Sequence, residues 1–159
     1  MKLIFVAFII LLALMTSAQC QQTATDWYNK GVDLYGQNKY DEAINAFDEA
    51  IKINPNDASA WYNKGMTLYV QGKNDEAIKC FDEAIRIDPN HVNAWDNKGN
   101  ALDDLGKYDD AIKCFDEAIR IDPNHVNAWY NKGVVLKALG RTTEADAAFA
   151  KAKGLQDGK

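Results

Sequence analysis

The sequence predicts an all-α protein, a solenoid in which four units of two helices stack one after another. The four tryptophans of the chain follow one another at intervals of 34 residues, at Trp27, Trp61, Trp95 and Trp129. An Asn-Lys-Gly triplet begins two residues after each tryptophan, and the three prolines also step by 34. A fixed period of this size is the signature of stacked repeats, which bury their apolar faces against neighbouring copies.

The repeats account for nearly all of the chain beyond its first 23 residues, because residues 24–159 contain four times 34 positions. We expect a segment outside the fold at 1–18, a short spacer at 19–23, and units at 24–57, 58–91, 92–125 and 126–159. The length of 159 residues therefore corresponds to a repeat array and not to one globular core.

Each unit reads as two helices. In the third unit Leu105 continues the helical spacing set by Trp95, and Gly106 interrupts the run. The acidic pair 109–110 then places negative charge at the start of a second helix, where the helix dipole is positive. Apolar residues of this helix recur until Asp122-Pro123 ends it; they are Ala111, Ile112, Phe115, Ala118, Ile119 and Ile121.

These residues resemble the tetratricopeptide repeat family, whose unit is a 34-residue helix-turn-helix. The family has an aromatic residue at position 4, small residues at positions 8, 20 and 27, an aromatic at 24 and a proline at 32. The last five of these are Gly31, Ala43, Ala50, Phe47 and Pro55 in the first unit. The resemblance covers essentially the whole chain after residue 23, and implies a right-handed α-solenoid that binds other proteins.

The resemblance also implies a ligand groove, because the first helices of the family line a concave face. When the groove positions of the family are transferred to this sequence, the candidate groove residues are Tyr28, Asn29, Tyr62, Asn63, Met66, Tyr69, Asp96, Asn97, Asn100, Asp103, Tyr130 and Asn131. We expect the asparagines to bond the backbone of an extended peptide and the tyrosines to add contact area. The alternative is that both residue types only support the scaffold.

The charges in this groove predict the kind of ligand. Asp96, Asp103 and Asp104 predict an acidic patch suited to Lys or Arg side chains. Some members of the family clamp a C-terminal carboxylate with basic residues at positions that hold Tyr28, Asn63, Asn93 and Asn97 here. The basic clamp is therefore absent from this sequence.

At position 7 of the family's 34-residue unit, every unit of this chain has a lysine in place of the usual large aliphatic residue. The four lysines are Lys30, Lys64, Lys98 and Lys132. We expect each to lay its methylene stem across the seam between units and to send its charge to solvent. The alternative is a row of lysines that binds phosphate or carboxylate groups.

The last unit shows where the array ends. Two isoleucines of the second helix, which should pack against the next unit, become Asp146 and Lys153 in the fourth. A polar outer face is what a terminal repeat needs for solubility. We find no comparable change at the start. The first helix, Asp26–Tyr35, is therefore a candidate partner surface, for a homodimer or for an envelope complex in which the chain is a structural subunit.

The N-terminal segment has the pattern of a secretory signal. Lys2 supplies a positive charge, an apolar run covers residues 3–15, and three small residues ending at Ala18 follow. Cleavage after Ala18, retention as a membrane anchor, and lipidation of Cys20 remain open, although Gln19 departs from the small residue that a lipoprotein box requires. All three predict a protein that is secreted or held at the outer face of the membrane.

Other functions lack support in the sequence. A net charge of −5 argues against nucleic-acid binding, which needs a basic surface. Cys80 and Cys114 are one repeat apart and should remain unbridged and packed as small apolar residues, and His91 and His125 are too separated for one metal ion. We find no catalytic or metal-binding motif, and therefore expect no cofactor, no metal and no enzyme activity. A scaffold that binds a protein or peptide is the expected function.

Overall fold

The computed structural model describes residues 22–158, so the predicted signal and Cys20 lie outside the described residues. The described chain folds into eight helices without a strand, which confirms the all-α solenoid. They are α2 (Ala24–Gly36), α3 (Tyr40–Ile53), α4 (Ala58–Val70), α5 (Asn74–Ile87), α6 (Val92–Asp104), α7 (Tyr108–Ile121), α8 (Val126–Ala138) and α9 (Thr142–Gln156). Within residues 22–158, no helix has the length and apolarity to cross a membrane.

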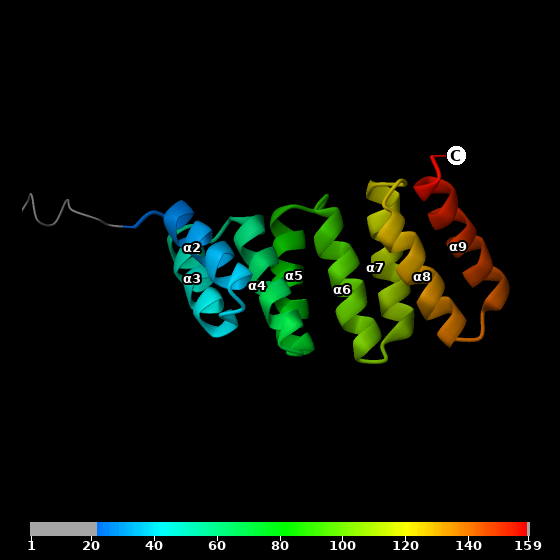
Figure 1. Ribbon diagram of the computed structural model, residues 1–159, viewed down its shortest axis with the longest axis horizontal. Helices are drawn as coiled ribbons and strands as arrows, with labels where there is room; N and C mark the ends of the chain where they lie inside the picture. Colours follow the sequence, from blue (N-terminus) through cyan, green and yellow to red (C-terminus); the bar gives the residue numbers. More distant parts are fainter. Residues whose placement is uncertain (1–21, 159) are drawn as a thin grey trace, which may run out of the picture.

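The helices form an elongated array in chain order, with α2 and α9 at opposite ends (Figure 1). Each helix packs against its neighbours in sequence, and α2, α4, α6 and α8 also contact one another in succession. No such contact joins α3, α5, α7 and α9 within the described chain. The array therefore curves with the first helix of each pair on the inner side.

A glycine and a phenylalanine join the two helices of every pair. A Cβ atom on Gly65 would lie 2.7 Å from Cε1 of Phe81, and the equivalent distance for Gly99 and Phe115 is 2.5 Å. Phe81 and Phe115 have 0% of their surface exposed. Because only glycine leaves room for the ring, this position fixes how closely the two helices approach.

The turns explain why glycine and tryptophan recur with the period of the repeat. Gly72, between α4 and α5, has a φ of +74°, and the equivalent Asn38 has a φ of 59°, a conformation that glycine and asparagine tolerate best. The indole nitrogen of Trp61 donates to the carbonyl oxygen of Pro55 at 3.0 Å, and the two later tryptophans bond their prolines in the same way. Trp61, Trp95 and Trp129 therefore each stabilise the turn that precedes their own helix.

The lysine row has a different role from the expected one. Nζ of Lys64 lies 2.6 Å from a carboxylate oxygen of Asp48 in the preceding pair and 5.6 Å from the centre of the Trp61 ring. Lys98 and Lys132 repeat both contacts, and the three side chains are 19–21% exposed. The expectation that these charges point to solvent was wrong for all three, because an aspartate one repeat earlier supplies a partner across each seam.

The first face of the array is polar, which corrects the expectation of an unmarked start. Ala60 and Thr67 of α4 are 0% exposed against the preceding pair, as are their equivalents on α6 and α8. In α2 the same two positions are Asp26 and Asp33, both exposed. Asp26 also caps its own helix, since its carboxylate accepts from the backbone N–H of Thr23 at 2.9 Å. Both ends of the array therefore carry charge where inner units carry apolar or small residues.

We predict that Gly65→Ala destabilises the protein by about 1–3 kcal/mol, because the added methyl group would overlap the Phe81 ring. Gly36→Ala is the matched control, since no atom lies within 4 Å of its built Cβ. The control should leave stability unchanged or raise it by up to about 1 kcal/mol through helix propensity. Urea unfolding followed by circular dichroism measures both, and equal effects of the two substitutions would contradict the close contact.

Candidate ligand groove and the junctions between repeats

The inner face formed by α2, α4, α6 and α8 presents apolar and aromatic side chains to solvent. Val32 on α2 is 42% exposed, and Val134 and Tyr130 on α8 are 40% and 55% exposed. The remaining predicted groove residues, apart from the exposed Asn29 and the buried Asp96, are half-buried; they are Tyr28, Tyr62, Asn63, Met66, Tyr69, Asn97, Asn100, Asp103 and Asn131. The structure thus brings the predicted residues to one face, but their side chains differ in how far they are exposed to solvent.

The asparagines join neighbouring pairs of helices. Nδ2 of Asn63 donates to the hydroxyl of Tyr28 at 3.1 Å and to the carbonyl of Ser59 at 2.9 Å. Nδ2 of Asn97 makes the same two bonds, to the hydroxyl of Tyr62 and the carbonyl of Asn93, at 3.1 and 2.9 Å. Since each amide group has two protons, these bonds use the donors that a peptide carbonyl would need. The side-chain oxygens remain as the acceptors that these residues offer to a ligand.

The third junction replaces the tyrosine by an aspartate. Asp96 is 5% exposed, and its carboxylate oxygens lie 3.3 Å from Nδ2 of Asn131 and 3.3 Å from Nε2 of His125. Burial raises the pKa of Asp96, while the charge and hydrogen bond of His125 act in the opposite direction. Asp96 was expected in the acidic patch of the groove, but its burial makes it a link between the third and fourth pairs.

Sequence reasoning assigned no role to the two histidines in these junctions. The ring of His91 lies 4.8 Å from that of Tyr62, and His125 occupies the equivalent place against Asp96. Both histidines stand 29 residues after their partner, a constant spacing that could have indicated a shared contact. The spacing alone does not show that the turn before the next helix folds back onto this position.

The acidic patch is made by two aspartates at the end of α6. Burial and the neighbouring charge of Asp104 raise the pKa of Asp103. Burial and the hydrogen bond from Tyr69 to Asp104 raise the pKa of Tyr69 to about 12. Within residues 22–158 neither aspartate has an ion-pair partner. The patch is therefore a site of negative charge that a basic group of a ligand would neutralise.

The described residues contain no cluster of three or more potential metal ligands. Cys80 and Cys114 are unbridged and are 5% and 4% exposed, which confirms that they pack as small apolar residues. Burial raises the pKa of each thiol to about 11, so both are protonated and unreactive at neutral pH. The arrangement is suited to binding by shape, hydrogen bonds and charge.

We predict that Asp96→Asn stabilises the protein increasingly as pH rises. Because burial raises the pKa of Asp96, the folded state holds this proton more tightly than the unfolded state. The wild type therefore loses stability relative to the variant as pH rises from the ordinary value of 3.8 through the raised pKa. Urea unfolding at several values between about pH 3.5 and 7 gives the difference in free energy of unfolding.

Asp109→Asn, at an exposed position on α7, controls for general loss of negative charge. Repeating the comparison in a His125→Gln background removes the titratable partner at hydrogen-bond distance from Asp96. A difference between variant and wild type that stays constant over this range would show that Asp96 is not a buried charge.

Comparison with known proteins agrees with this architecture. Family models described as tetratricopeptide repeat or TPR repeat match residues 28–92, 80–113, 99–140 and 126–158. No curated protein sequence matches the chain.

Solved structures show the same fold at low sequence identity. A crystal structure of MamA is 22% identical with a TM-score of 0.81, covering 84% of this chain and 78% of that one. The structure of MamA residues 41-end from Desulfovibrio magneticus RS-1 is 22% identical in sequence with a TM-score of 0.81, and the match covers 87% of this chain and 78% of that one. The first TPR of Spaghetti (RPAP3), bound to the HSP90 peptide SRMEEVD, is 23% identical in sequence with a TM-score of 0.73. That match covers 76% of this chain and 96% of the other. The family models together span nearly all of the described residues, and the chain belongs to the tetratricopeptide repeat family.

Proposed function

We propose that this protein is an interaction scaffold that binds a basic peptide or partner helix along its inner face. The observation that carries this proposal is the acidic patch of Asp103 and Asp104, which has no ion-pair partner in the described chain. The same inner face also carries exposed apolar side chains such as Val134. A Lys or Arg of the ligand would neutralise the patch, while the exposed Val134 would contact its apolar residues.

The charge of the groove favours a ligand unlike that of the RPAP3 domain. The HSP90 peptide in that structure, SRMEEVD, has three acidic residues. The positions where some family members place a basic clamp hold Tyr28, Asn63, Asn93 and Asn97 in this chain. Two of these asparagines already donate their amide protons within the scaffold. Acidic peptides would therefore meet negative charge without a compensating clamp.

We predict that the protein retains short random peptides rich in Lys and Arg and not a matched pool rich in Asp and Glu. Asp103→Asn with Asp104→Asn should weaken binding of the basic pool by about threefold to tenfold, since each exposed ion pair contributes up to ~1 kcal/mol. Fluorescence polarisation with labelled pools measures this effect.

The matched control combines Glu42→Gln with Asp109→Asn, which removes two exposed negative charges from α3 and α7, outside the groove. Equal weakening by this control would show that only net charge matters. Equal retention of acidic and basic pools by the wild type would contradict the proposed ligand class.

We further propose that the scaffold acts outside the cytoplasm, either secreted or tethered at the outer face of the membrane. The support is the sequence pattern of Lys2, the apolar run at 3–15 and the small residues ending at Ala18. The rival function, an envelope subunit assembling through its first helix, is disfavoured by the exposed Asp26 and Asp33 on that face.

We predict that the intact mass of the protein from its native host corresponds to a chain that begins after Ala18. A lipidated form would instead begin at Cys20 with added acyl mass, and a retained anchor would keep residue 1 and stay in the membrane fraction after a salt wash. A full-length chain recovered in the soluble cytoplasmic fraction would contradict export in every form.

A further inference from the structure

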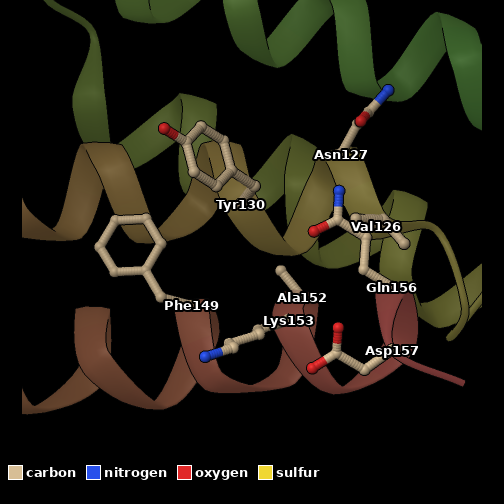
Figure 2. Close-up of a pocket in the computed structure, with 8 residues that line it drawn as sticks. All are labelled: Val126, Asn127, Tyr130, Phe149, Ala152, Lys153, Gln156 and Asp157. Atoms are coloured by element: carbon tan, nitrogen blue, oxygen red, sulfur yellow. The ribbon is translucent and has the colours of Figure 1, made fainter. Parts of the chain in front are cut away.

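A second groove lies at the end of the array, between α8 and α9, away from the acidic patch. It has a volume of about 750 Å³, and its lining includes Tyr130, Phe149 and Ala152, with Lys153 on α9 and Asp157 directly after that helix. Figure 2 shows Tyr130 and Phe149 facing each other from the two helices. Their ring centres are 5.5 Å apart.

The first two pairs of the array have the same aromatic groove, and in each of them the next helix packs into it. In the first pair Tyr28 lies 6.0 Å from Phe47, centre to centre, and α4 packs beside them. Ala60 of α4 shares a cluster with Ala50 and Ile51, the equivalents of Ala152 and Lys153. The hydroxyl of Tyr28 accepts from Asn63 of the same helix. The occupant of an inner groove is thus an α-helix held by one small residue and one amide.

The terminal groove has no such helix within residues 22–158. Phe47, Phe81 and Phe115 are at most 1% exposed, whereas Phe149 is half-buried. Tyr130 is 55% exposed, and its hydroxyl has no hydrogen-bond partner in the described chain. The aromatic floor is already assembled as in the inner grooves, but it remains open to solvent.

The residues that differ from the inner grooves specify the chemistry of an occupant. Lys153 replaces the isoleucine that faces Ala60 in the first junction, so it favours an acidic residue there. Asp146 replaces Ile112, which shares a cluster with Val135 of the next helix, so it favours a basic residue at that place. On α4 the matching positions are Ala60, Asn63 and Thr67, which are three and seven residues apart.

We propose that the groove between α8 and α9 binds a helix of another protein with an acidic residue, an amide residue three positions later and a basic residue seven positions later. The acid pairs with Lys153, the amide donates to the hydroxyl of Tyr130, and the base pairs with Asp146. Residues three and seven apart lie on one face of a helix, so a single helix presents all three groups.

The first helix of a second copy fits this pattern in part and is therefore excluded as the occupant. Asp26 and Asn29 supply the acid and the amide, but Asp33 would meet Asp146 with like charge. Lys30 would also face Ala150 in place of the aspartate that pairs with each inner lysine. These mismatches oppose head-to-tail association of the protein with itself.

The near-match of α2 supplies the test, because Asp33→Lys completes the pattern within this chain. Sedimentation should show that the wild type is monomeric and that Asp33→Lys associates head to tail, with at least a tenfold lower dissociation constant. Adding Lys153→Glu or Asp146→Lys to Asp33→Lys should reverse the association. Asp109→Lys makes the same charge change at an exposed site on α7 and should leave a monomer.

A labelled, helix-stabilised peptide of residues 24–37 carrying Asp33→Lys gives a second measurement on the wild-type protein. It should bind at least tenfold more tightly than the peptide with the native Asp33. Asp146→Lys in the protein should abolish this preference, whereas Tyr130→Ala or Lys153→Glu should weaken the binding of both peptides. Self-association of the wild type equal to that of Asp33→Lys would make a second copy the occupant and overturn the proposal. Equal binding of the two peptides, or no binding of either, would also overturn the proposal. Neither result bears on the acidic patch of the inner face, so the two proposals fail independently.

Discussion

The close contact between a glycine of the first helix and a phenylalanine of the second determines the geometry of every repeat. Gly31, Gly65, Gly99 and Gly133 each leave the space that an aromatic ring occupies, with a built Cβ 2.5–2.7 Å from the nearest ring atom. Because the ring fills this space, the two helices have one separation and one register. Tyr28, Tyr62 and Asp96, which stand three positions before the first three of these glycines, are then placed where the following helix docks.

The junctions use many of the residues that the inner face would otherwise offer to a ligand. Asn63 and Asn97 give their amide protons to tyrosines of the preceding pair, and Asp96 is buried with His125 and Asn131. Across the outer seam, Lys64 on α4, Lys98 on α6 and Lys132 on α8 each pair with an aspartate of the preceding pair. A polar group that is already satisfied within the scaffold contributes less to ligand binding than one that is exposed and unpaired. This constraint leaves the exposed apolar side chains and the patch of Asp103 and Asp104 as the binding surface.

The predicted pairs of helices were confirmed, whereas the predicted surroundings of Lys64 and Asp96 were wrong. The 34-residue period placed each tryptophan, glycine and phenylalanine correctly, since these residues contact others within their own unit or turn. The charge of Lys64 was wrongly assigned to solvent because its partner, Asp48, belongs to the preceding unit. Asp96 was assigned to the groove surface for the same reason, since its burial comes from residues 29 and 35 positions later.

By itself, the sequence determined that the chain is a tetratricopeptide solenoid of four units with a charged last face, because a periodic pattern specifies local packing wherever it recurs. The burial or exposure of residues at positions where the repeat pattern changes became known only from the tertiary structure. Asp26 and Asp33 mark the first face as an end, which becomes evident only when their equivalents on the other three units prove fully buried. Tyr130 and Phe149 likewise look ordinary in the sequence, and the groove between them exists because no helix of the described chain covers it. Burial is a property of the neighbours that a residue has in space, and at the two ends of an array those neighbours are missing.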